Sequence, residues 1–90
     1  MSLQSRMREK LMVSLNPTRL DVVNESHLHA DHASSPGSGE SHFRVLIVSG
    51  DFAGKSRVER HRIVNELLRD ELKDGVHALA IKALAPGELV

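Results

Sequence analysis

The chain of 90 residues has no cysteine, no tryptophan and no tyrosine, and phenylalanine occurs only twice. Without cysteine, disulfide bonds cannot stabilise the fold, and a metal site made only of thiolates from this chain is excluded. Basic and acidic residues balance at 12 each, so nucleic-acid binding through overall charge is disfavoured and only a local basic patch could serve. The sequence also lacks an apolar run of roughly 20 residues, the length that spans a bilayer, and it lacks a signal-peptide core near its start. We therefore expect a cytoplasmic protein that does not contact membranes.

The size of the chain limits what it can do. Ninety residues are expected to form one domain, 1–90, and a domain this small buries only about 60% of the surface of its unfolded chain. A core this thin leaves no deep pocket for a small-molecule substrate. Ser41, His42 and Asp51 are residue types of a hydrolase triad, but no nucleophile motif surrounds the serine, and no glycine-rich phosphate loop is present. The sequence therefore favours a protein that is not an enzyme.

The apolar pattern of the first half predicts a helix followed by two strands. Apolar residues every four positions indicate an amphipathic helix over 3–15, which Asn16-Pro17 ends because proline disfavours a helical residue before it. Short apolar stretches predict strands over 19–25 and 41–49, which would pair as a hairpin. One face of the second strand carries three apolar side chains: Phe43, Val45 and Ile47.

The second half predicts a helix and a last strand. Ser56 followed by Glu59 is a capping box, in which each side chain satisfies a free backbone N–H, and it begins a helix that runs to about residue 73. Gly75 fits the left-handed position just past the helix end. The apolar run over 76–84 predicts a strand parallel to a neighbour, because a strand reached through a helix usually joins its sheet in that direction. The apolar stripe of the helix comprises Val58, Ile63, Val64, Leu67, Leu68 and Leu72. The order is therefore α-β-β-α-β, an α+β fold.

A long polar stretch, 26–40, separates the first two predicted strands. It is rich in serine and glycine, and loops of this length inside compact domains are uncommon and tend to be functional or disordered. It also contains three of the six histidines: His27, His29 and His32. Composition alone leaves two interpretations open, a solvated polar loop and a metal-binding loop.

Four short motifs follow one another along the chain: Ser41-His42-Phe43-Arg44-Val45, Phe52-x-Gly54, Arg60-His61-Arg62 and Val76-His77-Ala78-Leu79. Each motif is weak alone, but their order and spacing closely resemble the BolA family. The resemblance covers the chain from about Met7 to Leu84. It implies a fold similar to the class II KH domain, with helices on one face of a three-stranded mixed sheet.

The resemblance also implies a cofactor and a partner. BolA proteins pair with monothiol glutaredoxins, and the heterodimer can bridge a two-iron, two-sulfur cluster. The implied histidine ligands here are His77, near the start of the last strand, and His29 in the loop, with His32 and His27 as alternates. Imidazole ligates iron in such clusters, as in Rieske centres. Because this chain has no thiol, the glutaredoxin cysteine and glutathione would supply the other ligands, which suits iron–sulfur cluster trafficking or iron sensing.

Judged without the family, the histidines have plainer interpretations. His77 at a strand start is by default a capped, half-buried side chain. His61 falls on the apolar side of its helix and is expected to be packed there. His42 alternates with Phe43, so it is expected to point away from the core face as a structural or solvent-facing residue.

DNA binding is the alternative function, since some BolA relatives are described as DNA-binding regulators of transcription in stress response and cell morphology. The candidate phosphate contacts are Lys55, Arg57, Arg60 and Arg62. They could equally form a solvated helix face, because Glu59 and Glu66 interrupt them. The chain also lacks the Gly-x-x-Gly loop with which KH domains clamp phosphates.

Overall fold

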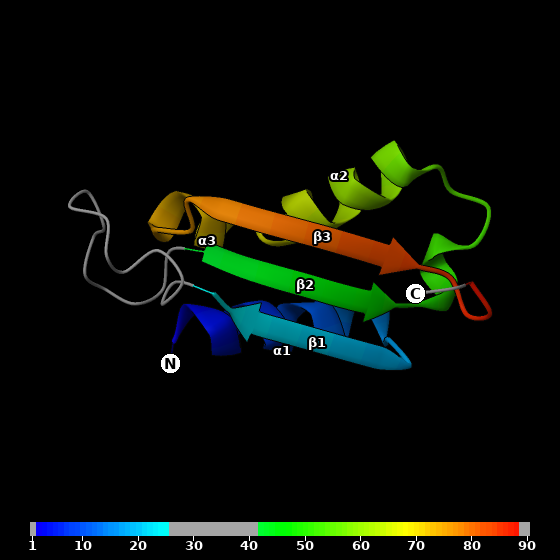
Figure 1. Ribbon diagram of the computed structural model, residues 1–90, viewed down its shortest axis with the longest axis horizontal. Coiled ribbons are helices and arrows are strands. Elements are labelled where there is room, and N and C mark those ends of the chain that lie inside the picture. Colours follow the sequence, from blue (N-terminus) through cyan, green and yellow to red (C-terminus); the bar gives the residue numbers. More distant parts are fainter. Residues whose placement is uncertain (1, 26–41, 89–90) are drawn as a thin grey trace.

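Helices cover one face of a three-stranded sheet (Figure 1). The computed structural model describes residues 2–25 and 42–88. The elements, in chain order, are α1 Leu3–Leu15, β1 Arg19–Asn24, β2 His42–Val48, α2 Arg57–Leu67, α3 Arg69–Asp74 and β3 Ala78–Leu84, with a short 3₁₀ turn, Gly50–Phe52, after β2. The predicted loop 26–40 lies outside the described residues.

The sheet has the order β1-β2-β3 and is mixed. β1 and β2 are antiparallel, with Val22 opposite Val45, and β2 and β3 are parallel, with Val45 opposite Ile81. The parallel pair needs a crossover, and α2 and α3 provide it. The predicted hairpin, the parallel last strand and the α+β fold are therefore confirmed.

The core lies between the sheet and the helices. Alternation along β2 directs every second side chain to the helix-covered face, so Phe43, Val45 and Ile47 are buried as expected. The apolar residues that recur every four positions along α1 also pack into this core. The buried hydrophobic residues are Met7, Leu11, Leu15, Leu20, Val22, Phe43, Val45, Ile47, Phe52, Val64, Leu68, Val76, Ala83 and Ala85.

The single helix predicted from Ser56 to residue 73 is instead two helices. Ser56 Oγ accepts the Glu59 N–H at 3.1 Å, which confirms the serine half of the capping box. The helix then breaks at Leu68, whose backbone leaves the helical region (φ −100°, ψ 15°). The break turns α3 so that Leu68 and Glu71 are both fully buried. Continuous helical periodicity could not reveal the break, because the apolar spacing persists through it.

Val58 was wrongly included in the apolar stripe of the second helix. Its side chain is 61% exposed. Figure 1 shows α2 rising away from β3 toward its first turn, so the sheet does not cover this end of the helix. A periodic pattern gives the direction of a side chain but not the length over which the neighbouring layer extends.

A buried serine ties the end of α1 to the end of β2. The Ser49 hydroxyl donates to the Leu15 carbonyl at 2.7 Å and accepts the Asp51 N–H at 3.2 Å, and the residue is fully buried. Ser49→Ala would leave both partners without this hydroxyl, and we expect it to lower the free energy of unfolding by about 1–3 kcal/mol. Urea denaturation measures the change. Ser14→Ala, at an exposed position of α1, is the control, and an equal effect of the two substitutions would contradict the prediction.

Candidate functional site

His77 is an exposed side chain on a firmly held stretch of backbone. Gly75 turns the chain out of α3 with φ 146°, a conformation that favours glycine. Val76 is then buried, and its N–H donates to the Glu71 carbonyl at 3.2 Å. Ala78, directly after His77, is the first residue of β3 and lies opposite His42. The default expectation of a half-buried histidine is therefore wrong, because the imidazole lies at the surface.

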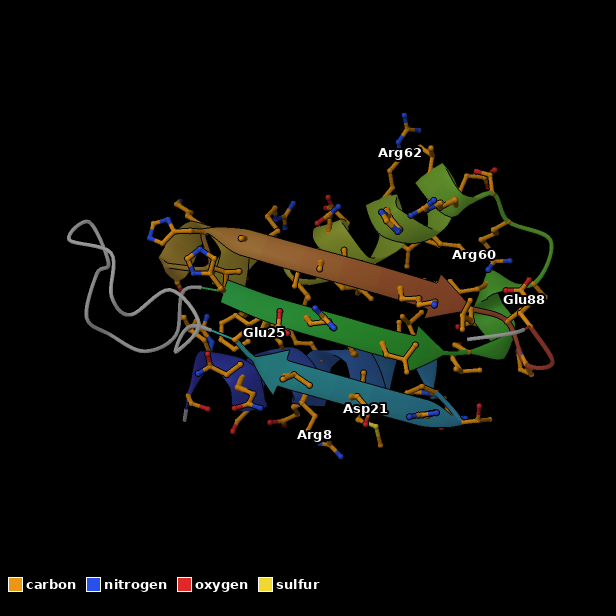
Figure 2. All side chains as sticks on the ribbon, viewed as in Figure 1. Arg8, Asp21, Glu25, Arg60, Arg62 and Glu88 are labelled. Carbon is orange, nitrogen blue, oxygen red and sulfur yellow. The ribbon has the colours of Figure 1, made fainter. Side chains whose placement is uncertain are left out.

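Both ends of the histidine-rich segment 26–41 lie at the same end of the sheet as His77, and His42, directly after the nearer end, pairs with Ala78. The Glu25 N–H donates to the His42 carbonyl at 2.8 Å, and the Glu25 carboxylate pairs with Arg44 at 3.3 Å. Figure 2 shows Glu25 where β1 ends and β2 begins. Because adjacent strands are about 4.8 Å apart, Glu25 lies roughly two strand spacings, or ~10 Å, from the start of β3. The segment therefore leaves and rejoins the sheet at the end where His77 lies.

His27, His29 and His32 themselves lie outside the described residues. An extended chain advances about 3.3–3.6 Å per residue, so His29, four residues after Glu25, has a reach of about 14 Å. The corresponding reach is about 7 Å for His27 and about 24 Å for His32. The reach of His29 and that of His32 exceed the distance of about 10 Å from Glu25 to the start of β3, so chain length permits either residue to approach His77. The reach of His27 is shorter than this distance. Among the described residues, no group of three or more His, Cys, Asp or Glu side chains could hold a metal ion, so such a site needs ligands from elsewhere.

The other two histidines are half-buried. His42 begins β2 on the face opposite Phe43, as the strand alternation predicts. His61 does not pack into the core: it lies on α2 in the wall of a surface groove that Ile81 and Lys82 of β3 also line. The helix rises away from the sheet at this end, which explains why the apolar side of α2 is open here.

Three of the four basic residues predicted as DNA contacts, Lys55, Arg57 and Arg60, line the groove with His61. Arg60 is also bound by Glu88 in two hydrogen bonds of 2.6 and 2.9 Å. Arg62 lines a different, mostly apolar groove beside Leu67. Figure 2 shows Arg60 next to Glu88 and Arg62 pointing away from the sheet.

Sequence analysis missed Lys82, which lies in the same groove as Lys55 and Arg57. It is exposed on β3, where it pairs with Leu46 of β2, and it lines the groove together with residues of the first turns of α2. The available signal was that Lys82 interrupts an otherwise apolar run. Nothing local indicated which other residues it would join.

The Arg60 guanidinium and the Ala85 N–H, which donates to the Glu88 carboxylate at 2.8 Å, lower the pKa of Glu88 from 4.5 to about 2. A lowered pKa in the folded state means that this carboxylate stabilises the fold fully above about pH 4.5 and ceases to do so as the pH falls through about 2. We expect the difference in unfolding free energy between wild type and Glu88→Gln to be constant above pH 4.5 and to shrink below it. Urea denaturation at several pH values measures this difference. NMR titration of the Glu88 carboxyl gives the pKa directly, and a midpoint unmoved by Arg60→Gln would contradict the assignment.

No helix in the described part of the chain is long and apolar enough to cross a membrane.

The order α-β-β-α-β, with the crossover helix broken in two, and a mixed three-stranded sheet define a small two-layer α+β protein that presents a histidine at one end of its sheet. The model of the BolA-like protein family matches residues 11–88. The chain belongs to the BolA family, which confirms the resemblance noted from its motifs.

Individual relatives agree with this assignment. An uncharacterized protein in the cobS 5' region of Sinorhizobium sp is 54% identical over 89 residues, 98% of this chain and 96% of that protein. The DNA-binding transcriptional regulator BolA of Haemophilus influenzae is 40% identical over 88 residues, 98% of this chain and 82% of that protein. The solved structure of BolA1 from Arabidopsis thaliana matches with a TM-score of 0.86 and 47% identity, covering 97% of this chain and 95% of that one. The chain spans 54% of the chloroplastic BOLA1 protein of the same plant.

Proposed function

We propose that this protein is a non-enzymatic accessory protein that shares a two-iron, two-sulfur cluster with a monothiol glutaredoxin in iron–sulfur cluster trafficking or iron sensing. The observation that carries the proposal is the exposed His77, between buried Val76 and paired Ala78, at the same end of the sheet as both ends of the segment that contains three further histidines. His77 is the first ligand and His29 the second, with His32 and His27 as alternates.

The donor set of the chain fits this cofactor. Imidazole nitrogen ligates iron in two-iron clusters, and it must be neutral to do so. Within residues 2–25 and 42–88, His77 has no hydrogen-bond or ion-pair partner, so no competing contact must break before it binds. The chain has no thiol, so sulfur ligands come from the glutaredoxin cysteine and from glutathione. When bound, the cluster supplies exchangeable iron and sulfide and a redox centre.

The backbone around His77 orients the ligand. Val76 is fixed in the core and Ala78 in the sheet, so the Cα of His77 has little freedom while its side chain is exposed. A ligand preorganised in this way loses little conformational entropy on binding. The second histidine, in contrast, lies on a segment whose two ends are fixed at the sheet by the Glu25–His42 hydrogen bond.

Co-expression with a monothiol glutaredoxin tests the proposal. The purified heterodimer is expected to contain about two iron and two sulfide ions, and its visible circular dichroism spectrum is expected to differ from that of the glutaredoxin purified alone, because imidazole ligation alters the cluster. A heterodimer without iron, or one whose spectrum equals that of glutaredoxin alone, would refute the proposal. Single substitutions His27→Ala, His29→Ala and His32→Ala in the same complex then identify the second ligand, and we expect His29→Ala to alter the spectrum.

DNA-binding regulation of transcription has less support as the main function. The relative from Haemophilus influenzae carries that name, but of the four candidate basic residues in this chain Arg60 is paired with Glu88, and Arg62 lies in a different groove from the other three. Net charge is zero and the described residues offer no aromatic platform on which bases could stack.

A further inference from the structure

A groove between α2 and β3 is lined by four cationic residues, three of which have no acidic partner among the described residues. These three are Lys55, Arg57 and Lys82; the fourth, Arg60, is paired with Glu88, and His61 also lines the groove. Within the described residues none of the three cations forms an ion pair, and no acidic side chain lines the groove. The Lys55 ammonium donates to the Asp51 carbonyl at 2.7 Å, a neutral acceptor that leaves its charge uncompensated. The groove therefore favours a ligand that carries negative charge.

The remaining walls are apolar. Ile81, Ala83 and Leu84 of β3 form the floor, and the groove has a volume of about 600 Å³. This volume is within the range of roughly 300–1,000 Å³ that is typical of small-molecule sites. An apolar floor below a cationic rim suits an organic molecule with one anionic group better than an inorganic ion.

The groove is remote from the histidine end of the sheet. His77 precedes the first residue of β3, whereas Ala83 and Leu84 are its last two residues. Seven residues of strand separate these ends by about 20 Å. The groove also adjoins the first turn of α2, where the positive end of the helix dipole adds to the attraction for an anion.

The carboxylate of Glu88 already binds Arg60, the fourth cationic residue that lines the groove. Glu88 accepts two hydrogen bonds from Arg60 and one from the Ala85 N–H, and Arg60 also donates to the Ala83 carbonyl at 3.0 Å. Arg60 is therefore engaged by an internal anion. A phosphate and a carboxylate compete for the same planar, two-pronged donor.

We propose that this groove binds the phosphate group of a small organic phosphate through Lys55, Arg57 and Lys82, and that Glu88 acts as a tethered carboxylate that restricts access to Arg60. The three cations match the charge of a phosphate monoester dianion better than that of a single carboxylate. A small ligand is favoured over a nucleic acid because the cationic residues are confined to one short groove.

NMR titration of the isolated chain tests the site, with phenyl phosphate as the probe and inorganic phosphate, benzoate and duplex DNA for comparison. Phenyl phosphate is expected to shift the amides of residues 55–61 and 81–84 but not those of His42 and His77. It is expected to bind more tightly than phosphate, which lacks the ring, and than benzoate, which has one charge. Arg57→Gln/Lys82→Gln is expected to weaken binding about fivefold or more. No localised shifts, or duplex DNA binding in the groove that phenyl phosphate does not displace, would overturn the proposal.

The tethered carboxylate has its own test in the same titration. Glu88→Gln keeps the side-chain shape but removes the charge that engages Arg60, so the affinity for phenyl phosphate is expected to rise several-fold. Glu9→Gln on α1 makes the same change in net charge at an exposed position and is expected to have no such effect. Adding Arg60→Gln to Glu88→Gln is expected to return the affinity for phenyl phosphate to about that of the wild type. Equal effects of Glu88→Gln and Glu9→Gln would refute the role of Glu88. These titrations need neither iron nor a glutaredoxin, so their outcome is independent of the proposed cluster function.

Discussion

Replacing Arg6 and Lys10 together by methionine is expected to lower the free energy of unfolding by about 3–5 kcal/mol, because it leaves a buried carboxylate without a partner. Glu71 of α3 is fully buried and receives hydrogen bonds from two of the three cations of α1, at 3.1 Å from Arg6 Nε and 2.8 Å from Lys10 Nζ. The hydrogen bond to Glu71 is also the main reason why the pKa of Lys10 is raised. Urea denaturation of the double variant at pH 7 measures the loss.

A third substitution distinguishes this cause from a general weakening of α1. Adding Glu71→Leu removes the buried charge, and we expect the triple variant to regain most of the lost stability, since apolar replacements of buried ion pairs are often neutral or stabilising. The exposed pair of Glu66 and Arg69, 2.9 Å apart, is the control: Glu66→Gln/Arg69→Met is expected to cost less than about 1 kcal/mol. If the triple variant were no more stable than the double, the orphaned charge would not be the cause.

His77→Ala is expected to remove most of the iron from the heterodimer with glutaredoxin and to change the visible circular dichroism of any cluster that remains. Even the loss of an outer partner of a metal ligand lowers metal affinity by about 10–100-fold, so the loss of a ligand itself is expected to cost at least about tenfold. The measurement is iron and sulfide per heterodimer together with the spectrum. Because the His77 side chain is exposed, the substitution is expected to leave the fold unchanged, which far-ultraviolet circular dichroism verifies.

His61→Ala is the matched control for this variant. His61 lies in the groove at the opposite end of β3, and its loss is expected to leave both iron content and spectrum as in the wild type. An unchanged spectrum with His77→Ala would show that His77 is not a ligand. A change of equal size with His61→Ala would point to a docking effect instead of ligation.

The elements that the sequence predicted well are those with an uninterrupted pattern. The four-residue repeat of α1 and the alternation of Phe43, Val45 and Ile47 each reflect one neighbouring layer along the whole element, so local periodicity was sufficient. The apolar pattern gave a wrong prediction of burial or of helix length where the neighbouring layer ends or the chain changes direction. Val58 lies beyond the part of α2 that the sheet covers, and the helix breaks at Leu68, just before Glu71 meets α1.

The candidate site was predicted only in part for a related reason. The motif around His77 was recognisable from its sequence, and its exposure follows from local chain geometry between Gly75 and β3. Sequence proximity grouped Lys55, Arg57 and Arg60, which line one groove, with Arg62, which lines another. It could not reveal Lys82, which is 25 residues from Arg57 in the chain but lines the same groove.

The amino-acid sequence by itself determined the types and order of the strands and helices, the family and the chemical limits of the site. A chain without cysteine can offer an iron–sulfur cluster no thiolate ligand, whatever its fold. The tertiary structure alone decided which charged side chains meet, Glu71 with Arg6 and Lys10 and Glu88 with Arg60, and that Lys82 and Arg57 line one groove. Local preferences fix backbone conformation over a few residues, whereas these meetings depend on sheet register and helix packing between segments far apart in the chain.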